Sequence, residues 1–240
     1  MMNCAQAILS LFLLTPCDKD GGGHEAIEAA VAHPRRPEAD LVRDEVRKPS
    51  EVLSFLGIQP GMTVLDVFAG AGYYTEILDL LVGEEGKVLS HNNQAFLNFV
   101  GPQVELRFAN DRLANTDKLI GEAVYLELTD GSIDPALMIL AYHDFFYTSD
   151  DWGWPRIDED KFLDLLCRAM KPGAILGVAD HITHAEGDIS KLVLELHRIR
   201  PREVIEDMTG SCFDLVAESN VLRNSSDDHS TPAIAPEMSG

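Results

Sequence analysis

Apolar runs of strand length alternate with amphipathic helical segments along most of the chain. The clearest strand spans Thr63 to Phe68, and the spacing of apolar residues predicts a helix over Tyr73 to Val82. Further strands are predicted at residues 87–91, 117–120, 135–142, 174–179 and 213–219. Several of these runs are apolar throughout, which is typical of strands covered on both faces. The pattern therefore predicts an α/β fold, with a mostly parallel sheet and helices on both of its faces.

The segments outside this pattern suggest how the chain is divided. The predicted domain spans residues 41–222, with further helices at 41–56, 94–113, 158–170 and 202–208. Residues 18–40 are polar and contain Gly21-Gly22-Gly23 and two prolines, so we interpret them as a linker. Residues 223–240 are polar, contain proline and have no strand-like run, so we interpret them as a tail.

The N-terminus holds a short apolar run, Ala5 to Leu14, of the length found in the apolar region of signal peptides. With Cys17 close behind it, residues 1–17 resemble the lipid-attachment site of bacterial lipoproteins. This resemblance implies the cell envelope or periplasm as the location, with membrane anchoring through Cys17. Pro16 stands where a small residue is usual, and no Lys or Arg precedes the run. An ordinary N-terminus on a cytoplasmic protein is the alternative.

Charge and cysteine content narrow the classes of partner. The net charge is −21 and no basic stripe occurs, so the chain should repel phosphate backbones. We therefore expect no nucleic-acid substrate and favour a cationic or neutral small molecule. The cysteines lack metal-finger spacing, and Cys167 and Cys212 are interpreted as small buried apolar side chains. The oligomeric state is left open.

The most specific motif is the glycine loop after the first clear strand. Asp66 ends that strand, Gly70 and Gly72 follow, and a helix begins at Tyr73. Such a loop lets a ligand approach the main chain beside the positive end of a helix dipole. A nicotinamide-binding fold would place glycine or alanine three residues after Gly72, but Thr75 occupies that position. The second strand also ends in His91-Asn92-Asn93, without the acid that binds the nicotinamide ribose.

The loop instead resembles the S-adenosylmethionine loop of class I methyltransferases. Glu122 lies 12 residues before Asp134, the spacing that this family uses before its fourth strand. More narrowly, the chain is similar to a group of bacterial predicted methyltransferases, which carry four marker stretches. Here these stretches are residues 68–76 (FAGAGYYTE), 91–93 (HNN), 141–144 (AYHD) and 224–229 (NSSDDH). The resemblance covers residues 49–219 and names no methyl acceptor.

The resemblance implies a cofactor site at three places. The glycine loop would hold the methionine end of S-adenosylmethionine through Asp66, Ala69, Gly70 and Gly72. His91 and Asn92 would lie at the ribose, where the family usually has an acid, and Glu122 would lie near the adenine. Phe68 replaces the first glycine of the family pattern and narrows the loop.

Tyr142, His143 and Asp144 follow the fourth predicted strand, where this fold places side chains beside the methyl group of the cofactor. Histidine has a near-neutral reference pKa, so His143 suits a general base that Asp144 would orient. The alternative is that His143 only positions the loop.

Histidines also end the second and fifth predicted strands, as His91 and His181. With His143, Asp180 and the Asp227-Asp228-His229 run, they offer a set of ligands to a metal. Their spacing matches no metal motif, so we expect no metal site.

The family sheet usually ends in an antiparallel strand, for which residues after Leu222 offer no candidate. We therefore expect that strand to be missing, which leaves the edge at residues 213–219 unpaired. The leading hypothesis is S-adenosylmethionine-dependent methyl transfer to a small molecule. The alternatives are a non-catalytic S-adenosylmethionine-binding domain and a nicotinamide-dependent oxidoreductase.

Overall fold

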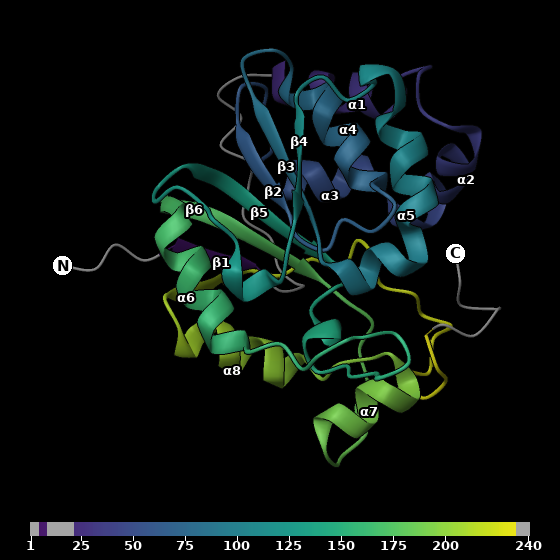
Figure 1. Ribbon diagram of the computed structural model, residues 1–240, viewed down its shortest axis with the longest axis vertical. Coiled ribbons are helices and arrows are strands. Elements are labelled where there is room, and N and C mark those ends of the chain that lie inside the picture. The colour runs from purple at the N-terminus through teal and green to yellow at the C-terminus, as the bar shows by residue number, and fades with distance from the viewer. Residues whose placement is uncertain (1–4, 9–21, 234–240) are drawn as a thin grey trace.

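The computed structural model describes residues 5–8 and 22–233. One sheet contains seven strands in the order β4-β3-β2-β5-β6-β1-β7, and every strand pairing in these residues is parallel (Figure 1). The strands are β1 (Ala5–Ile8), β2 (Thr63–Asp66), β3 (Lys87–Asn92), β4 (Thr116–Ile120), β5 (Ile133–Ile139), β6 (Met170–Ala179) and β7 (Phe213–Ala217). The predicted α/β class with a mostly parallel sheet is confirmed.

Helices cover both faces of this sheet. They are α1 (Gly22–Val31), α2 (Glu38–Arg47), α3 (Pro49–Phe55), α4 (Tyr73–Val82), α5 (Gln94–Phe108), α6 (Glu159–Ala169), α7 (Ile189–Leu196) and α8 (Pro201–Gly210). Helices α1, α3 and α4 pack on one face, and α6 and α8 pack on the other. Neighbouring residues of β2 point to opposite faces of the sheet. Val64 packs in the core cluster with α1, α3 and α4, and Leu65 packs in the cluster with α6 and α8. Three short 3-10 turns are η1 (Ala109–Asp111), η2 (Ala123–Tyr125) and η3 (His143–Phe145).

Local sequence signals explain where several helices begin. Side-chain oxygens of Asn93, Asp158 and Asp188 accept hydrogen bonds from backbone N–H groups in the first turns of α5, α6 and α7. Pro49 and Pro201 open α3 and α8, where the missing N–H of proline costs nothing. Helix α7 has no counterpart among the predicted elements.

The linker prediction is wrong for the residues that form α1. Ile27 and Ala30 of this helix are 2% and 3% exposed and pack into the core with α3 and α4. Helix α2 also begins within the predicted linker, at Glu38. Residues 18–40 are polar overall, so their composition did not reveal the narrow apolar face of α1. This face is buried only because the helix packs against the core. Helix α5, in turn, runs on through Pro102.

The N-terminal strand occupies a place that the sequence analysis left empty. Strand β1 pairs with β6 on one side and with β7 on the other, both in parallel. Residues 223–233 form no strand, as expected, but β7 has a neighbour in β1. Residues 9–14 and Cys17 of the signal-like segment lie outside the described residues. Among the helices of residues 22–233, none combines the length and the apolarity that a membrane crossing requires.

Candidate functional site

The glycine loop between β2 and α4 has an unusual backbone. Phe68, Gly70 and Gly72 have φ angles of 50°, 58° and 83°, in the left-handed region that glycine tolerates best. A Cβ atom on Gly72 would lie 2.7 Å from Cδ of Arg107, so only glycine fits there without displacing that side chain. The loop therefore turns sharply at the carboxyl edge of the sheet, as the sequence predicts.

Asp66 lies beneath this loop, with 3% of the residue exposed. The hydroxyl of Thr75 donates to Oδ2 of Asp66 over 2.7 Å and lies 3.1 Å from the hydroxyl of Ser90. Burial raises the pKa of Asp66 to about 6, and the hydrogen bond from Thr75 opposes that rise. Asp66 thus ties the end of β2 to α4 within the protein. Thr75, which departs from the nicotinamide-binding motif, therefore has a structural role as the hydrogen-bond partner of Asp66.

Asn92 closes the loop from the neighbouring strand. Its Oδ1 accepts from the N–H of Gly70 over 3.0 Å, and its Nδ2 donates to the carbonyl of Gly70 over 2.9 Å. The amide group predicted at the ribose is therefore engaged by the backbone of the loop. A cavity of about 240 Å³ opens beside Asn92, between α5 and the ends of β3 and β4, with Leu97 and Ile120 in its wall.

His91 is fully buried and joins three segments. Its Nδ1 accepts from the N–H of Phe68 over 3.4 Å, and its Nε2 lies 2.9 Å from the carbonyl of Gly121. Burial lowers the pKa of His91 to about 4, so the ring is neutral and donates to Gly121 through Nε2. His91, like Asn92, makes its contacts with the protein chain. Glu122 follows directly and is half-buried at the start of η2.

Phe68 is the centre of an aromatic cluster at this edge of the sheet. Its side chain is buried, and its ring centroid lies 4.7 Å from that of His91 and 5.5 Å from that of Phe96. Phe145 and Trp154, which follow β5, lie 5.6 Å and 6.1 Å away. The ring therefore occupies the space between the end of β3 and the turn after β5. The sequence analysis expected Phe68 to narrow the loop, and the structure shows that its ring fills the inner side.

A buried ionic cluster supports the loop from behind, and the sequence analysis did not identify it. Arg107 of α5 pairs with Asp40 of α2 over 2.8 Å and with Glu76 of α4 over 2.5 Å, and its Nε donates to the carbonyl of Ala71. The fully buried Glu76 also pairs with Arg112. The sequence offered one sign of this cluster, because Glu76 lies on the apolar face of the helix predicted over residues 73–82.

A second group of polar side chains follows β5 and β6. Nδ1 of His143 lies 2.7 Å from Oδ1 of Asp180, and the backbone N–H of His143 donates to Oδ2 of the same carboxylate. Asp144 lies on the other side, with Oδ1 3.5 Å from Nε2 of His143. The carboxylate that orients His143 is therefore Asp180, whereas Asp144 was the predicted residue. Both side chains of the His143–Asp180 pair are at most 5% exposed.

The charges in this group shift one another. Burial by itself would lower the pKa of His143, but the carboxylates of Asp180 and Asp144 raise it to about 9. Burial raises the pKa of Asp144 to about 6, against the attraction of His143. Burial opposes ionisation of Asp180 as well, yet its contacts with His143 hold its pKa below the usual value. At neutral pH this group holds a cationic imidazole beside the Asp180 carboxylate.

His197, which has the left-handed conformation at the end of α7, brings a third segment to this group. Its ring centroid lies 5.0 Å from that of His143, and its buried Nδ1 has no hydrogen-bond partner among the described residues. Burial lowers the pKa of His197 to about 4, and the nearby His143 lowers it further. The sequence analysis assigned no role to His197, and α7 was not predicted.

The other predicted residues lie elsewhere. Tyr142 is buried with its hydroxyl 2.8 Å from Oδ2 of Asp207 on α8, so it does not join His143 and Asp144. Burial, followed by the Asp207 carboxylate, raises its pKa. The Asp227-Asp228-His229 run binds a different partner, because the carboxylate of Asp227 forms a two-point ion pair with Arg198.

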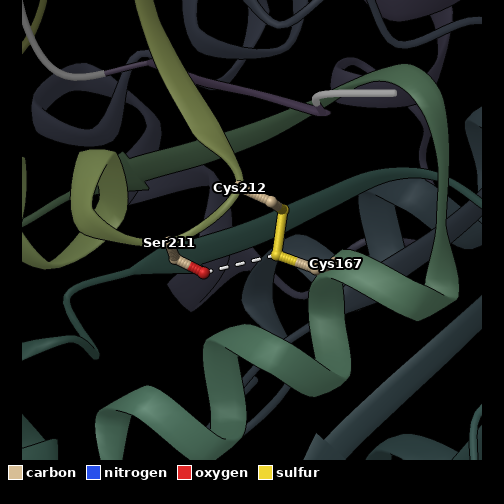
Figure 2. The surroundings of a disulfide bond; sticks show 3 residues. All are labelled: Cys167, Ser211 and Cys212. Carbon is tan, nitrogen blue, oxygen red and sulfur yellow. Dashed lines mark hydrogen bonds between the residues drawn. A yellow bond between two sulfur atoms is a disulfide. The ribbon is translucent and has the colours of Figure 1, made fainter. Parts of the chain in front are cut away.

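Cys167 and Cys212 form a disulfide, which corrects the interpretation of both as unlinked apolar side chains. Cys167 lies on α6 and Cys212 directly precedes β7, with 6.0 Å between their Cα atoms (Figure 2). The hydroxyl of Ser211 lies 3.3 Å from Sγ of Cys167. The sequence distance of 45 residues gave no sign of the pairing, because it depends on how α6 packs beside β7.

Comparison with known proteins identifies this architecture. Residues 46–131, which include the whole glycine loop, match the family model of protein-L-isoaspartate(D-aspartate) O-methyltransferase. A solved S-adenosylmethionine-dependent methyltransferase from Aquifex aeolicus is 27% identical, with a TM-score of 0.51, and the match covers 78% of this chain and 86% of that one. The chain has the Rossmann-like fold of class I S-adenosylmethionine-dependent methyltransferases. The search of curated protein sequences found no match to this chain.

One more solved structure supports the fold alone. Geranyl diphosphate C-methyltransferase from Streptomyces coelicolor A3(2), in complex with Mg²⁺, geranyl diphosphate and S-adenosyl-L-homocysteine, is 16% identical with a TM-score of 0.50. That match covers 76% of this chain and 69% of the other. These similarities support S-adenosylmethionine as the cofactor, so the nicotinamide alternative is not carried further.

The loop has the backbone that this cofactor needs. Ala69, Gly70 and Ala71 are half-exposed, and a Cβ on Gly70 would meet nothing closer than 3.8 Å, at the ring of Phe96. The main chain at Gly70 is therefore partly exposed on its outer side, with its N–H and carbonyl bonded to Asn92, while the ring of Phe68 fills the inner side. The residues fit the cofactor at the loop, and Phe68 is the side chain that restricts it.

Proposed function

We propose that the protein transfers a methyl group from S-adenosylmethionine to a small-molecule acceptor. The supporting observation is the juxtaposition of the glycine loop after β2 and the His143 group after β5, which are adjacent strands of the sheet. Because the carboxyl ends of parallel strands meet at one edge, the two groups face the same space. The ring of Phe68 in the loop contacts that of Phe145 in η3, which places the two regions in direct contact.

The residues of the chain divide the work between these regions. Ala69, Gly70 and Gly72 would hold the methionine end of the cofactor, which supplies an activated methyl group when bound. His91, Asn92 and Asp66 keep the loop in its sharp turn through their contacts with Phe68, Gly70 and Thr75. His143, held by Asp180, would receive a polar group of the acceptor and align it for direct displacement. With a net charge of −21 on the chain, a cationic or neutral acceptor is favoured.

Calorimetry with S-adenosyl-L-homocysteine tests the cofactor part of the proposal. The wild-type chain should bind it, and Gly70→Val should abolish binding because a branched side chain would cover the open main chain. Gly131→Val is the matched control, since Gly131 has nearly the same φ, 60° against 58°, and lies in an exposed turn before β5. Equal binding by both variants, or no heat with folded wild-type protein, would contradict the proposal.

Phe68 specifically favours a second candidate, a domain that binds the cofactor weakly and does not catalyse. Its ring packs on His91, Phe96, Phe145 and Trp154, so the cofactor must compete with an established cluster. Binding without turnover, across a panel of amines, phenols and thiols, would support this candidate. Production of S-adenosyl-L-homocysteine with any member of the panel would support the enzyme.

We further propose that the chain is exported to the cell envelope. Disulfides persist in oxidising compartments, and the Cys167–Cys212 bond accords with the signal-like segment at the N-terminus. Cleavage before Cys17 would remove β1 and leave β7 without its neighbour, so a lipid-anchored form and a seven-stranded form exclude each other. Mass spectrometry of the mature protein tests both points. An intact N-terminus with free thiols at Cys167 and Cys212 would refute export.

A further inference from the structure

We propose that His143, Asp144 and His197 bind a divalent first-row transition-metal ion. One potential ligand atom from each of these residues lies within 4.8 Å of the other two. Two ligands come from η3 after β5, and the third comes from the end of α7. The sequence analysis expected no metal site and considered His91 and His181 as partners of His143, because it could not foresee where α7 would end.

The distance between the first two ligands suits an ion better than a hydrogen bond. Nε2 of His143 lies 3.5 Å from Oδ1 of Asp144, beyond the range of a good N–H···O hydrogen bond. Two ligands bound to one tetrahedral ion, at bond lengths of about 2.1 Å, lie roughly 3.4 Å apart. A modest rotation of the imidazole of His197 would bring the third ligand into the same coordination sphere.

The surrounding contacts are those of a prepared metal ligand. Asp180 accepts from Nδ1 of His143, so Nε2 faces Asp144 and can bind an ion there once the ion displaces the proton from Nε2. The same carboxylate accepts from the backbone N–H groups of His143 and His181, so its own position is fixed. A histidine that donates its outer N–H to a carboxylate is the usual arrangement around protein-bound metals.

An unpartnered atom supplies independent support. Nδ1 of His197 is buried and has no hydrogen-bond partner among the described residues, although a buried polar atom normally has one. The backbone of His197 is left-handed, with φ 51°, and its ring centroid lies 5.0 Å from that of His143. A metal ion bound through Nδ1 would satisfy that atom.

The ligand set decides the kind of ion. Two imidazoles and one carboxylate favour Zn²⁺, Fe²⁺, Co²⁺ or Mn²⁺ over Mg²⁺ and Ca²⁺, which prefer oxygen ligands. With neutral imidazoles, the carboxylates of Asp144 and Asp180 together balance the charge of a divalent ion. Three protein ligands leave a position for water or for an acceptor oxygen. That catalytic role rests on the proposed function, whereas ion binding does not, so the two proposals can fail separately.

Titration of the intact chain with Zn²⁺, followed by calorimetry, tests the proposal, and Co²⁺ absorption reports the coordination. One ion should bind per chain, with the visible bands of Co²⁺ coordinated by nitrogen and oxygen. His197→Asn should weaken Zn²⁺ binding at least tenfold, and asparagine tolerates the left-handed conformation at that position. Asp180→Asn should weaken binding by about 10- to 100-fold, since it disturbs only the residue that orients His143.

Two controls separate this site from other histidines. His24→Ala, on the exposed surface of α1, should leave the affinity for Zn²⁺ unchanged. His229→Ala removes the histidine that lies 5.3 Å from His184 and should also leave it unchanged. No 1:1 binding by the wild-type chain, unchanged binding by His197→Asn, or loss of binding in either control would overturn the proposal.

Discussion

The two regions at the carboxyl edge of the sheet differ in how their polar atoms are used. Around the glycine loop, Asp66, His91 and Asn92 each find partners within the protein, and the ring of Phe68 packs between them and Phe145. Around η3, by contrast, Nδ1 of His197 has no hydrogen-bond partner among the described residues, and Oδ1 of Asp144 lies 3.5 Å from Nε2 of His143. These three loop side chains are satisfied within the protein, whereas the η3 region retains Nδ1 of His197 without a partner among the described residues.

This difference indicates that the polar side chains of the glycine loop fix its shape, whereas those around η3 can bind a ligand. Residues that the family resemblance assigns to the cofactor contribute here first to the shape of the loop, and only its main chain is open to a ligand. Unsatisfied buried atoms carry a free-energy cost that a bound group can remove, so they indicate where a ligand gains most. The four predictions below test this contrast, from the largest expected effect to the smallest.

Reduction of the Cys167–Cys212 disulfide should affect the half of the sheet that carries the η3 region. Loss of a cross-link that spans 45 residues should lower the free energy of unfolding by about 4 kcal/mol, mainly through the entropy of the unfolded chain. Hydrogen exchange of the Cys167→Ser/Cys212→Ser variant should rise in α6, α8 and β7. Uniform acceleration throughout β2, β3 and β4 would show instead that the two halves unfold as one unit.

Arg107→Met should destabilise the loop region from behind. The substitution leaves the buried carboxylates of Asp40 and Glu76 with only Arg43 and Arg112 as partners, at an expected cost of about 3 kcal/mol in a urea titration. Arg202→Met, which removes an exposed ion pair with Glu186, is the control and should leave stability nearly unchanged. Similar urea midpoints of unfolding for the two variants would show that Arg107 does not stabilise the loop.

Acidification should weaken the loop region through His91. Folding lowers the pKa of His91 from 6.5 to about 4, so in the window between these values the unfolded chain binds a proton that the folded chain does not. The contribution of His91 is complete above pH 6.5 and is lost as the pH falls, by about 2 kcal/mol at pH 5.

The raised pKa of Asp66 acts in the opposite direction, so the comparison must be made between variants. Urea titrations of the wild-type chain and of His91→Gln at several pH values isolate the contribution of His91 to the free energy of unfolding, because glutamine does not titrate. The difference in unfolding free energy between the two proteins should shrink toward pH 5. A difference that does not change with pH would mean that folding leaves the pKa of His91 unchanged.

Phe68→Gly should change the free energy of cofactor binding by less than the three effects above, although loss of the buried ring also destabilises the fold. Glycine tolerates the φ of 50° at this position and removes the ring that fills the inner side of the loop. We expect S-adenosyl-L-homocysteine to bind about tenfold more tightly, which corresponds to about 1.4 kcal/mol. Weaker binding to a variant that remains folded would show that the ring belongs to the cofactor site.

The sequence by itself determined the class of the fold and the position of the loop. Apolar strands between amphipathic helices predicted the parallel sheet, and the spacing of Asp66, Gly70 and Gly72 predicted the sharp turn after β2. These features follow from local periodicity and from the conformational freedom of glycine, both of which can be read within about ten residues of chain.

Only the tertiary structure decided which side chains meet. Asp180 approaches His143 because β5 and β6 are neighbours, His197 approaches because α7 ends beside η3, and Cys167 finds Cys212 because α6 packs near β7. Each of these contacts joins residues more than 30 positions apart. Their geometry depends on how the strands and helices pack, for which a single sequence carries no local signal.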